Sequence, residues 1–355
     1  MDLKDTKKSY KAFTGTTREE RFWEKESQLE GIFKDLEMYK DEIEEIDLSN
    51  NSISINVSKQ IAERINNLKN LKVVGFNDVF VSRSKEEIPK SLRLFIDALE
   101  GKQISVLNLS DNAFGPAGVS AFDFYLKTTK YLKELILMNN GLGPEGSSSV
   151  AEALKSNPNI CLERIRVGRN RLESKGATAF GSFFSTQTSL IEVVTFQNGI
   201  KEDGMINLLN GLANNKNIEI LKINDNSIVG KAADELIKLL KDLTKLRCLD
   251  ISDSKLGSEN SLKVMNILIN IDSLNEFYCN YNEIEDKESQ NEICNILTKK
   301  KYPFNKFEIK GNEIKKNIFK KIKTHPITEN ADVYSESEMD PDELLDLMDS
   351  LKIDN

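Results

Sequence analysis

Arg83 lies in a stretch whose residues could recognise a charged partner. The stretch reads Asp78-Val-Phe-Val-Ser-Arg83-Ser-Lys-Glu-Glu-Ile-Pro89. A guanidinium offers a planar set of donors that suits phosphate, carboxylate and other bidentate polar contacts. The stretch is about six residues longer than equivalent segments of the chain, and longer loops on a regular frame are where functional contacts concentrate. A solvated loop that ends at Pro89 is the alternative interpretation.

Two further segments place polar side chains beside a recurring asparagine. Arg169 and Arg171 flank Asn170, and Asn139 directly precedes Asn140. If the recurring asparagine serves the backbone, its neighbours stay available to a partner. For the two arginines, the alternative is a set of surface ion pairs with nearby acids, which would stabilise the fold little.

The chain has few residues for catalysis of its own. Its one histidine, His325, precedes Pro326, so no histidine-based triad, histidine-ligated metal site or haem site can form in the body of the chain. The cysteines show no metal-binding spacing and lie in apolar segments, as free thiols of a reducing compartment do. They are Cys161, Cys248, Cys279 and Cys294. We expect no metal site and no cofactor.

An internal repeat positions these residues. Leu107-Asn-Leu-Ser-Asp-Asn112-Ala-Phe114 recurs as Leu135 to Leu142, as Ile165 to Leu172 and as Leu221 to Ile228, which is the leucine-rich repeat pattern LxLxxNxL. With the weaker copies, the asparagine column runs through Asn51, Asp78, Asn112, Asn140, Asn170, Asn198, Asn226, Ser254, Asn282 and Asn312. Most steps are close to 28 residues, and the step from Asp78 to Asn112 is 34.

A 28-residue step leaves room for a short strand and a full helix in each unit. Amphipathic runs such as 146–154 and 232–240 fit those helices. Because one unit cannot bury its apolar face alone, the fold class expected is α/β. It is a right-handed leucine-rich-repeat solenoid, a ribonuclease-inhibitor-like horseshoe with an inner parallel sheet and outer helices. The column asparagines are expected to satisfy backbone groups of each turn.

Charge divides the chain. The net charge is −8, but residues 329–355 carry ten acids and one lysine, so the rest is nearly neutral and no nucleic-acid partner is expected. The sequence contains no run of about 18 consecutive apolar residues, so we expect no membrane-spanning segment. We predict an N-terminal cap over 1–40, a repeat domain with a C-terminal capping helix over 41–325, and an acidic tail over 326–355. An amphipathic segment in the tail could dock, bind a partner or act as an export signal.

Four blocks carry a resemblance to a known family. They are Phe76 to Pro89, Leu109 to Pro116, Asn139 to Pro144 and Gly168 to Glu173. Together they resemble the Ran GTPase-activating protein family over roughly residues 40–315. The resemblance implies an activator with no active site of its own. It would stimulate GTP hydrolysis by the small GTPase Ran in its GTP form, with or without a Ran-binding protein, in nucleocytoplasmic transport. GTP and magnesium would belong to the GTPase.

The resemblance also implies roles for individual residues. Arg83 takes the position of the family's essential loop arginine, which serves the interface rather than acting as an inserted arginine finger. Asn139 matches the asparagine that contacts Ran near the nucleotide, and Arg169 and Arg171 lie in a block expected on the Ran-facing rim. Weaker candidates are Asp111, Asn112 and Asp225.

Two function classes remain open. The first is the GTPase activator, expected in the cytoplasm, with perinuclear placement or shuttling as further options. The second is a non-catalytic repeat scaffold or ribonuclease-inhibitor-like binding protein. The insertion around Arg83 favours the activator, because a generic scaffold has no reason to break its register there.

Overall fold

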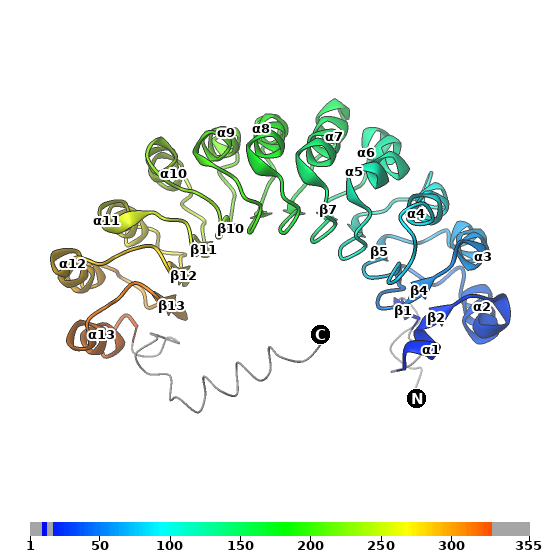
Figure 1. The fold of residues 1–355 in the computed structure, drawn as a ribbon, viewed down its shortest axis with the longest axis horizontal. Coiled ribbons are helices and arrows are strands. Elements are labelled where there is room, and N and C mark those ends of the chain that lie inside the picture. The colour runs from blue at the N-terminus through cyan, green and yellow to red at the C-terminus, as the bar shows by residue number, and fades with distance from the viewer. Residues whose placement is uncertain (1–8, 13–16, 329–355) are drawn as a thin grey trace. The chain divides into compact units, whose positions relative to one another are not determined.

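The computed structural model describes residues 9–12 and 17–328. The chain divides into two compact units, Met1–Asn215 and Lys216–Asn355. Each is built from short parallel strands in one layer, with helices on one side of that layer (Figure 1). None of the helices in the described residues is both long and apolar enough to cross a membrane. The predicted α/β leucine-rich-repeat fold is confirmed, and the predicted tail segment lies outside the described residues.

The first unit orders its strands as the chain does. They are β1 (Ser9–Lys11), β3 (Glu45–Asp47), β5 (Val73–Gly75), β6 (Val106–Asn108), β7 (Glu134–Ile136), β8 (Arg164–Arg166) and β9 (Glu192–Val194). The middle residue of each repeat strand is apolar and buried, as Ile46, Val74 and Leu107 show. A separate parallel pair joins β2 (Phe22–Trp23) to β4 (Ser52–Ile53).

Helices of the first unit follow their strands. They are α1 (Arg18–Arg21), η1 (Glu26–Leu29), α2 (Glu30–Met38), α3 (Ile55–Asn66), α4 (Ile88–Asp97), α5 (Gly115–Gly118), η2 (Val119–Ala121), α6 (Asp123–Thr128), α7 (Gly143–Ser156), α8 (Glu173–Phe184) and α9 (Glu202–Leu212). Proline opens α4, α5 and α7, where its missing N–H costs nothing. Helices α8 and α9 touch through backbone, because a Cβ on Gly181 or Gly211 would collide with main-chain atoms of the facing helix.

The second unit repeats the plan. Its elements are β10 (Ile220–Lys222), α10 (Lys231–Leu240), β11 (Cys248–Asp250), α11 (Gly257–Leu268), β12 (Glu276–Tyr278), α12 (Lys287–Leu297), β13 (Lys306–Glu308) and α13 (Lys316–Lys323). The last helix buries Ile318, Phe319 and Ile322 and exposes its lysines. It is therefore amphipathic, with its charged face in solvent.

The asparagine column forms a buried ladder. Asn112 accepts a hydrogen bond from the Val79 N–H at 2.9 Å and donates from Nδ2 to the carbonyls of Phe76 and Leu109 at 2.7 and 3.0 Å. Its own N–H donates to Asn140 Oδ1 at 2.9 Å. The same pattern recurs at Asn140, Asn170 and Asn282. The structural role predicted for this column is confirmed.

The prediction of Asp78 as a ladder position is wrong. Val74 pairs with Ile46 on one side and with Leu107 on the other, so the ladder position of that repeat is Val79 and not Asp78. The steps become 28 and 33 residues, and the insertion is five residues rather than six. The sequence misled because Asp78 resembles an asparagine in shape, whereas a valine at a ladder position keeps only its backbone groups.

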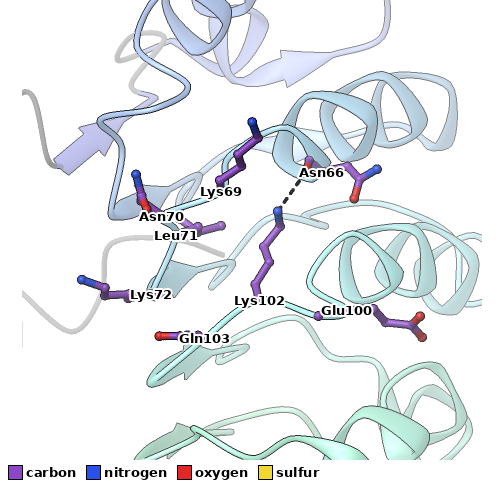
Figure 2. Close-up of a pocket in the computed structure, with 9 residues that line it drawn as sticks. Asn66, Lys69, Asn70, Leu71, Lys72, Glu100, Lys102 and Gln103 are labelled. Carbon is purple, nitrogen blue, oxygen red and sulfur yellow. Dashed lines mark hydrogen bonds between the residues drawn. The ribbon is translucent and has the colours of Figure 1, made fainter.

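A depression of about 410 Å³ lies where strands β5 and β6 begin (Figure 2). Lys102 points into it and donates from Nζ to the carbonyls of Asn66 and Leu68 at 2.9 and 3.0 Å. Those carbonyls close the end of α3, where a cation is favourable. Burial lowers the pKa of Lys102. The lysine therefore supports the helix end, and the candidate residues lie at the opposite ends of the strands.

Candidate functional site

A row of residues in left-handed backbone conformation follows the strands of the first unit. Each has φ between 52° and 62° and stands one place before a ladder position: Asn50, Asp78, Asp111, Asn139, Arg169 and Gln197. Asn and Asp tolerate this conformation, whereas for an arginine it costs roughly 1–2 kcal/mol. We call these positions the exit turns. The ladder holds the residue after each turn in the core, so the turn residue itself is held at the surface.

Asp111, Asn139 and Arg169 occupy the same position in consecutive repeats, because β6, β7 and β8 pair in register. The N–H of Asp111 donates to the Met138 carbonyl at 2.9 Å, and the N–H of Asn139 donates to the Gly168 carbonyl at 3.0 Å. The structure therefore brings three predicted residues together on a backbone that is hydrogen-bonded from turn to turn.

The Asn139 side chain is exposed but not free. Its Nδ2 donates to Asp111 Oδ1 at 2.8 Å. That contact fixes which way the amide faces, and within the described residues the amide oxygen accepts no hydrogen bond. Asp111 is therefore a partner of Asn139 within the chain, and the two form one polar unit.

Arg169 and Arg171 are both exposed, on either side of the buried Asn170. Arg171 also has a positive φ, of 55°. Within the part of the chain that the structure describes, neither guanidinium makes an ion pair or a hydrogen bond. The surface ion pairs considered from sequence are therefore not found among these residues, and the two charges are open to a partner.

Asn112 and Asp225 stand apart from this group. Asn112 is 2% exposed with its amide committed to the ladder, so it belongs to the frame and not to the candidate surface. Asp225 takes the exit-turn position in the second unit, with φ 53°. Burial, and then the charge of Asp253, raise the pKa of Asp225.

Arg83 lies in the inserted loop, residues 78–87. Its side chain faces inward, contrary to the expectation that the loop presents the arginine to a partner. Its side chain is 9% exposed. Nη1 donates to Glu24 Oε1 at 2.6 Å, and Nη2 donates to the Ser52 carbonyl at 2.7 Å. The guanidinium carbon also lies 5.4 Å from the centre of the Phe22 ring. The loop folds its arginine back on the chain because an acid, a carbonyl and a ring are already arranged to receive it.

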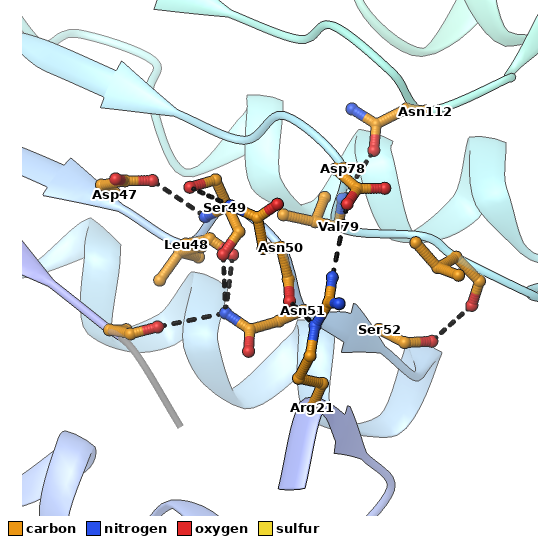
Figure 3. Close-up of polar contacts among 12 residues, drawn as sticks. Arg21, Asp47, Leu48, Ser49, Asn50, Asn51, Ser52, Asp78, Val79 and Asn112 are labelled. Carbon is orange, nitrogen blue, oxygen red and sulfur yellow. Dashed lines mark hydrogen bonds and ion pairs between the residues drawn. The ribbon is translucent and has the colours of Figure 1, made fainter. Parts of the chain in front are cut away.

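The inserted loop is tied to β4 and to the turn after it. The Ile53 N–H donates to the Val79 carbonyl at 2.9 Å, and Ser52 Oγ donates to the Val81 carbonyl at 2.6 Å (Figure 3). At the loop's far end, Glu87 Oε1 accepts from the Ile55 N–H at 2.8 Å. The loop is therefore an ordered layer over β4.

Sequence reasoning missed the partners that residues 21–24, here called the N-terminal segment, supply to the inserted loop. Figure 3 shows Arg21 reaching Asp78, with Nη2 at 3.4 Å from Oδ2, and its Nε donates to the Asn50 carbonyl. Burial raises the pKa of Asp78. The positive charge of Arg21 lowers this pKa and the negative charge of Asp111 raises it, so that the net shift is upward. The one tryptophan of the chain, Trp23, is fully buried in this segment. That residue was the available signal that the segment packs as part of the site.

A leucine-rich repeat model matches residues 104–122 and 130–151. Ran GTPase-activating protein 1 of Saccharomyces cerevisiae is 32% identical over 288 residues, covering 76% of this chain and 70% of the yeast protein. The chain belongs to the Ran GTPase-activating protein family. The Xenopus laevis member is 39% identical over 183 residues, which cover 48% of this chain and 31% of the frog protein.

Repeat similarity extends beyond this family. The ribonuclease inhibitor of Mus musculus is 26% identical over 157 residues, covering 44% of this chain and 34% of the mouse protein. Its match is shorter and less identical than the yeast match, and we attribute it to the shared repeat.

Proposed function

We propose that this protein is a GTPase-activating protein for a Ran-like small GTPase in its GTP form. The observation that carries the proposal is family membership, through the 32% identity with the yeast protein over 76% of this chain. The chain would have no active site of its own, and GTP and its magnesium would stay with the GTPase. We place its action in the cytoplasm, in nucleocytoplasmic transport, with or without an accessory Ran-binding protein.

The chemistry left to an activator is positioning. Intrinsic hydrolysis by small GTPases is slow, and many activators correct the placement of the water-orienting glutamine and add an arginine finger. We propose that this protein acts without a finger, by stabilising the GTPase's own catalytic residues. The inward position of Arg83 supports this, because both of its donating Nη atoms are already in use at 2.6 and 2.7 Å.

Asn139 is the residue we assign to the catalytic contact. Its amide is exposed and is held by Asp111 at 2.8 Å, so it can meet a polar side chain of the GTPase without losing much freedom on binding. The charges of Arg169 and Arg171, which have no ion-pair partner in the described part of the chain, would add attraction for acidic or phosphate groups next to it. We place Asp225 at the edge of the interface, as a secondary contact.

The test is single-turnover GTP hydrolysis by Ran and by an unrelated small GTPase, with and without the full chain. Activators that supply an arginine finger accelerate hydrolysis by roughly 10³- to 10⁵-fold, and we expect an acceleration in the same range, for Ran alone, from positioning without a finger. No acceleration of Ran would overturn the proposal. Equal acceleration of both GTPases would overturn its specificity, and tight binding of Ran without acceleration would favour the non-catalytic scaffold.

A further inference from the structure

The guanidinium of Arg83 joins three segments that are distant in sequence. Arg83 belongs to the inserted loop, its carbonyl acceptor Ser52 belongs to β4, and Glu24 directly follows β2. Strands β2 and β4 pair in parallel, and β4 in turn meets Phe80 of the loop through an antiparallel bridge. The side chain therefore spans β4 and ties the loop to the N-terminal segment.

We propose that Glu24 is a positioning residue for GTPase activation, acting through Arg83. The N-terminal segment 21–24 is then part of the activating machinery and not only a cap on the repeats. The inference rests on the function proposed above and extends it to residues outside the four blocks on which the family resemblance was based.

Glu24 supplies the only full countercharge found for Arg83 in the described residues. The arginine side chain is 9% exposed while that of Glu24 is 51% exposed, so the acid is the solvent-facing half of the pair. Arg83 Nε is buried without a hydrogen-bond partner in the described residues. A guanidinium so placed without its carboxylate would be desolvated and poorly paired, which is costly. Loss of Glu24 is therefore expected to turn Arg83 outward and to loosen the loop.

A second ion pair crosses in the opposite direction. Arg21 of the N-terminal segment reaches Asp78 at the start of the loop at 3.4 Å, whereas Arg83 of the loop reaches Glu24 of the segment. Two crossed pairs restrict sliding of the loop on β4 more than one pair would.

The loop leads directly to the proposed catalytic asparagine. The N–H of Asp78 donates to the Ser110 carbonyl at 2.9 Å, and the next residue, Asp111, holds Asn139 at 2.8 Å. A shift of the loop is thus transmitted to Asn139 through one backbone and one side-chain hydrogen bond. An error of about 1 Å in placement can cost roughly 100-fold in rate.

In the competing account, Arg83 breaks its ion pair with Glu24 when the GTPase binds and contacts the GTPase directly. The two accounts predict opposite signs for Glu24→Gln. If Arg83 acts directly, removal of the Glu24 charge frees it and activity stays equal or rises. If Arg83 acts by holding the loop, activity falls.

The experiment uses the full chain and single-turnover GTP hydrolysis by Ran at saturating activator. We expect Glu24→Gln to reduce the rate about 10-fold, with Glu24→Asp recovering part of it because the carboxylate is kept. Glu24→Gln added to Arg83→Ala should cause no further loss, since both act through one contact. The matched control is Glu26→Gln, which removes the same charge two residues along. Glu26 pairs with Arg64 of α3 at 3.2 Å and touches nothing in the loop through that pair.

Hydrogen–deuterium exchange over residues 79–87 tests the clamp without a GTPase. Faster exchange in Glu24→Gln but not in Glu26→Gln supports the proposal, and equal exchange overturns it. Unchanged or raised activity of Glu24→Gln, or a further loss on top of Arg83→Ala, also overturns it. If instead the unaltered chain does not accelerate hydrolysis, the proposed function fails, and the exchange result still decides whether Glu24 holds the loop.

Discussion

The inserted loop and the exit turns beside it hold their arginines in opposite ways. In the loop, Arg83 is 9% exposed and paired within the chain. In the exit turn after β8 and just beyond it, Arg169 and Arg171 are exposed and unpaired among the described residues. All three were candidates for contact with a partner on the same grounds of residue type. What separates them is the surface beneath each side chain.

The physical cause is the regularity of the repeat. A regular turn places its ladder residue in the core and its flanking residues in solvent. The side chain of Arg169 is therefore held on the solvent side of the turn. Where the register breaks, the extra residues lie over β4 and their side chains meet the N-terminal segment. An irregular loop can therefore be closed by its own chain, while regular turns stay open.

Arg83→Ala should have the largest effect. Loss of the pairs to Glu24 and the Ser52 carbonyl loosens the loop, and we expect single-turnover activation of Ran to fall roughly 100-fold. Arg83→Lys should fall nearly as far, because an ammonium cannot serve both acceptors with a planar fork. Retention of full activity by Arg83→Ala would remove the loop from the mechanism.

Asn139 and Asn140 allow a sharper contrast between surface and ladder. Asn139→Gly should lower activation by roughly 10- to 100-fold with little change in melting temperature, since the residue is exposed and glycine tolerates its positive φ of 54°. Asn140→Ala should instead lower the free energy of unfolding by about 1–3 kcal/mol, because buried backbone groups lose their partners. Activity and urea unfolding of both variants check this. Equal effects of the two substitutions would contradict the division.

Arg169→Ala and Arg171→Ala should have smaller effects that depend on salt. Exposed charges act mainly on encounter with the partner and are screened at high ionic strength. We expect the concentration of activator needed for half-maximal rate to rise by roughly 3- to 10-fold at low salt, and less at high salt. Arg247→Ala is the control for loss of an exposed positive charge away from the exit turns, because Arg247 lies just before β11, at the other end of a strand, and pairs with Glu219 at 3.4 Å. A salt-independent loss would indicate a role other than charge.

Asp78→Asn should show the smallest effect, on stability. Burial raises the pKa of Asp78 in the folded chain above the value of about 3.9 expected when unfolded. The ionised carboxylate is thus disfavoured by folding, so the variant should be more stable than the unaltered chain at neutral pH, by about 0.5 kcal/mol. The difference should shrink as pH falls through the raised pKa and vanish below about pH 3.9. Urea unfolding at pH 3.5, 5 and 7 measures it, and a variant less stable at pH 7 would show that Arg21 outweighs burial.

Most of the fold was predictable from sequence because the repeat recurs at a nearly constant step of about 28 residues. The 28-residue step predicted one strand and one helix per unit, and the asparagine column predicted the ladder with its turns. The error at Asp78 shows the limit of the pattern, since one atypical repeat with valine at the ladder position shifted the alignment by a residue. The cap over 1–40 was expected, but its contacts to the loop were not, because they join residues about 30 to 60 positions apart with no period to reveal them.

The sequence by itself determined the repeat, the type of fold and the family resemblance, since each depends on residue identities at fixed spacings. It also predicted that Asn139 and Arg169 neighbour ladder asparagines. Only the tertiary structure decided that Arg83 turns inward, that Asn139 is held by Asp111 and that Arg21 and Glu24 belong to the loop. Spacing along the chain determines which face a repeated residue takes, whereas the partner of an irregular side chain depends on which distant segment packs against it.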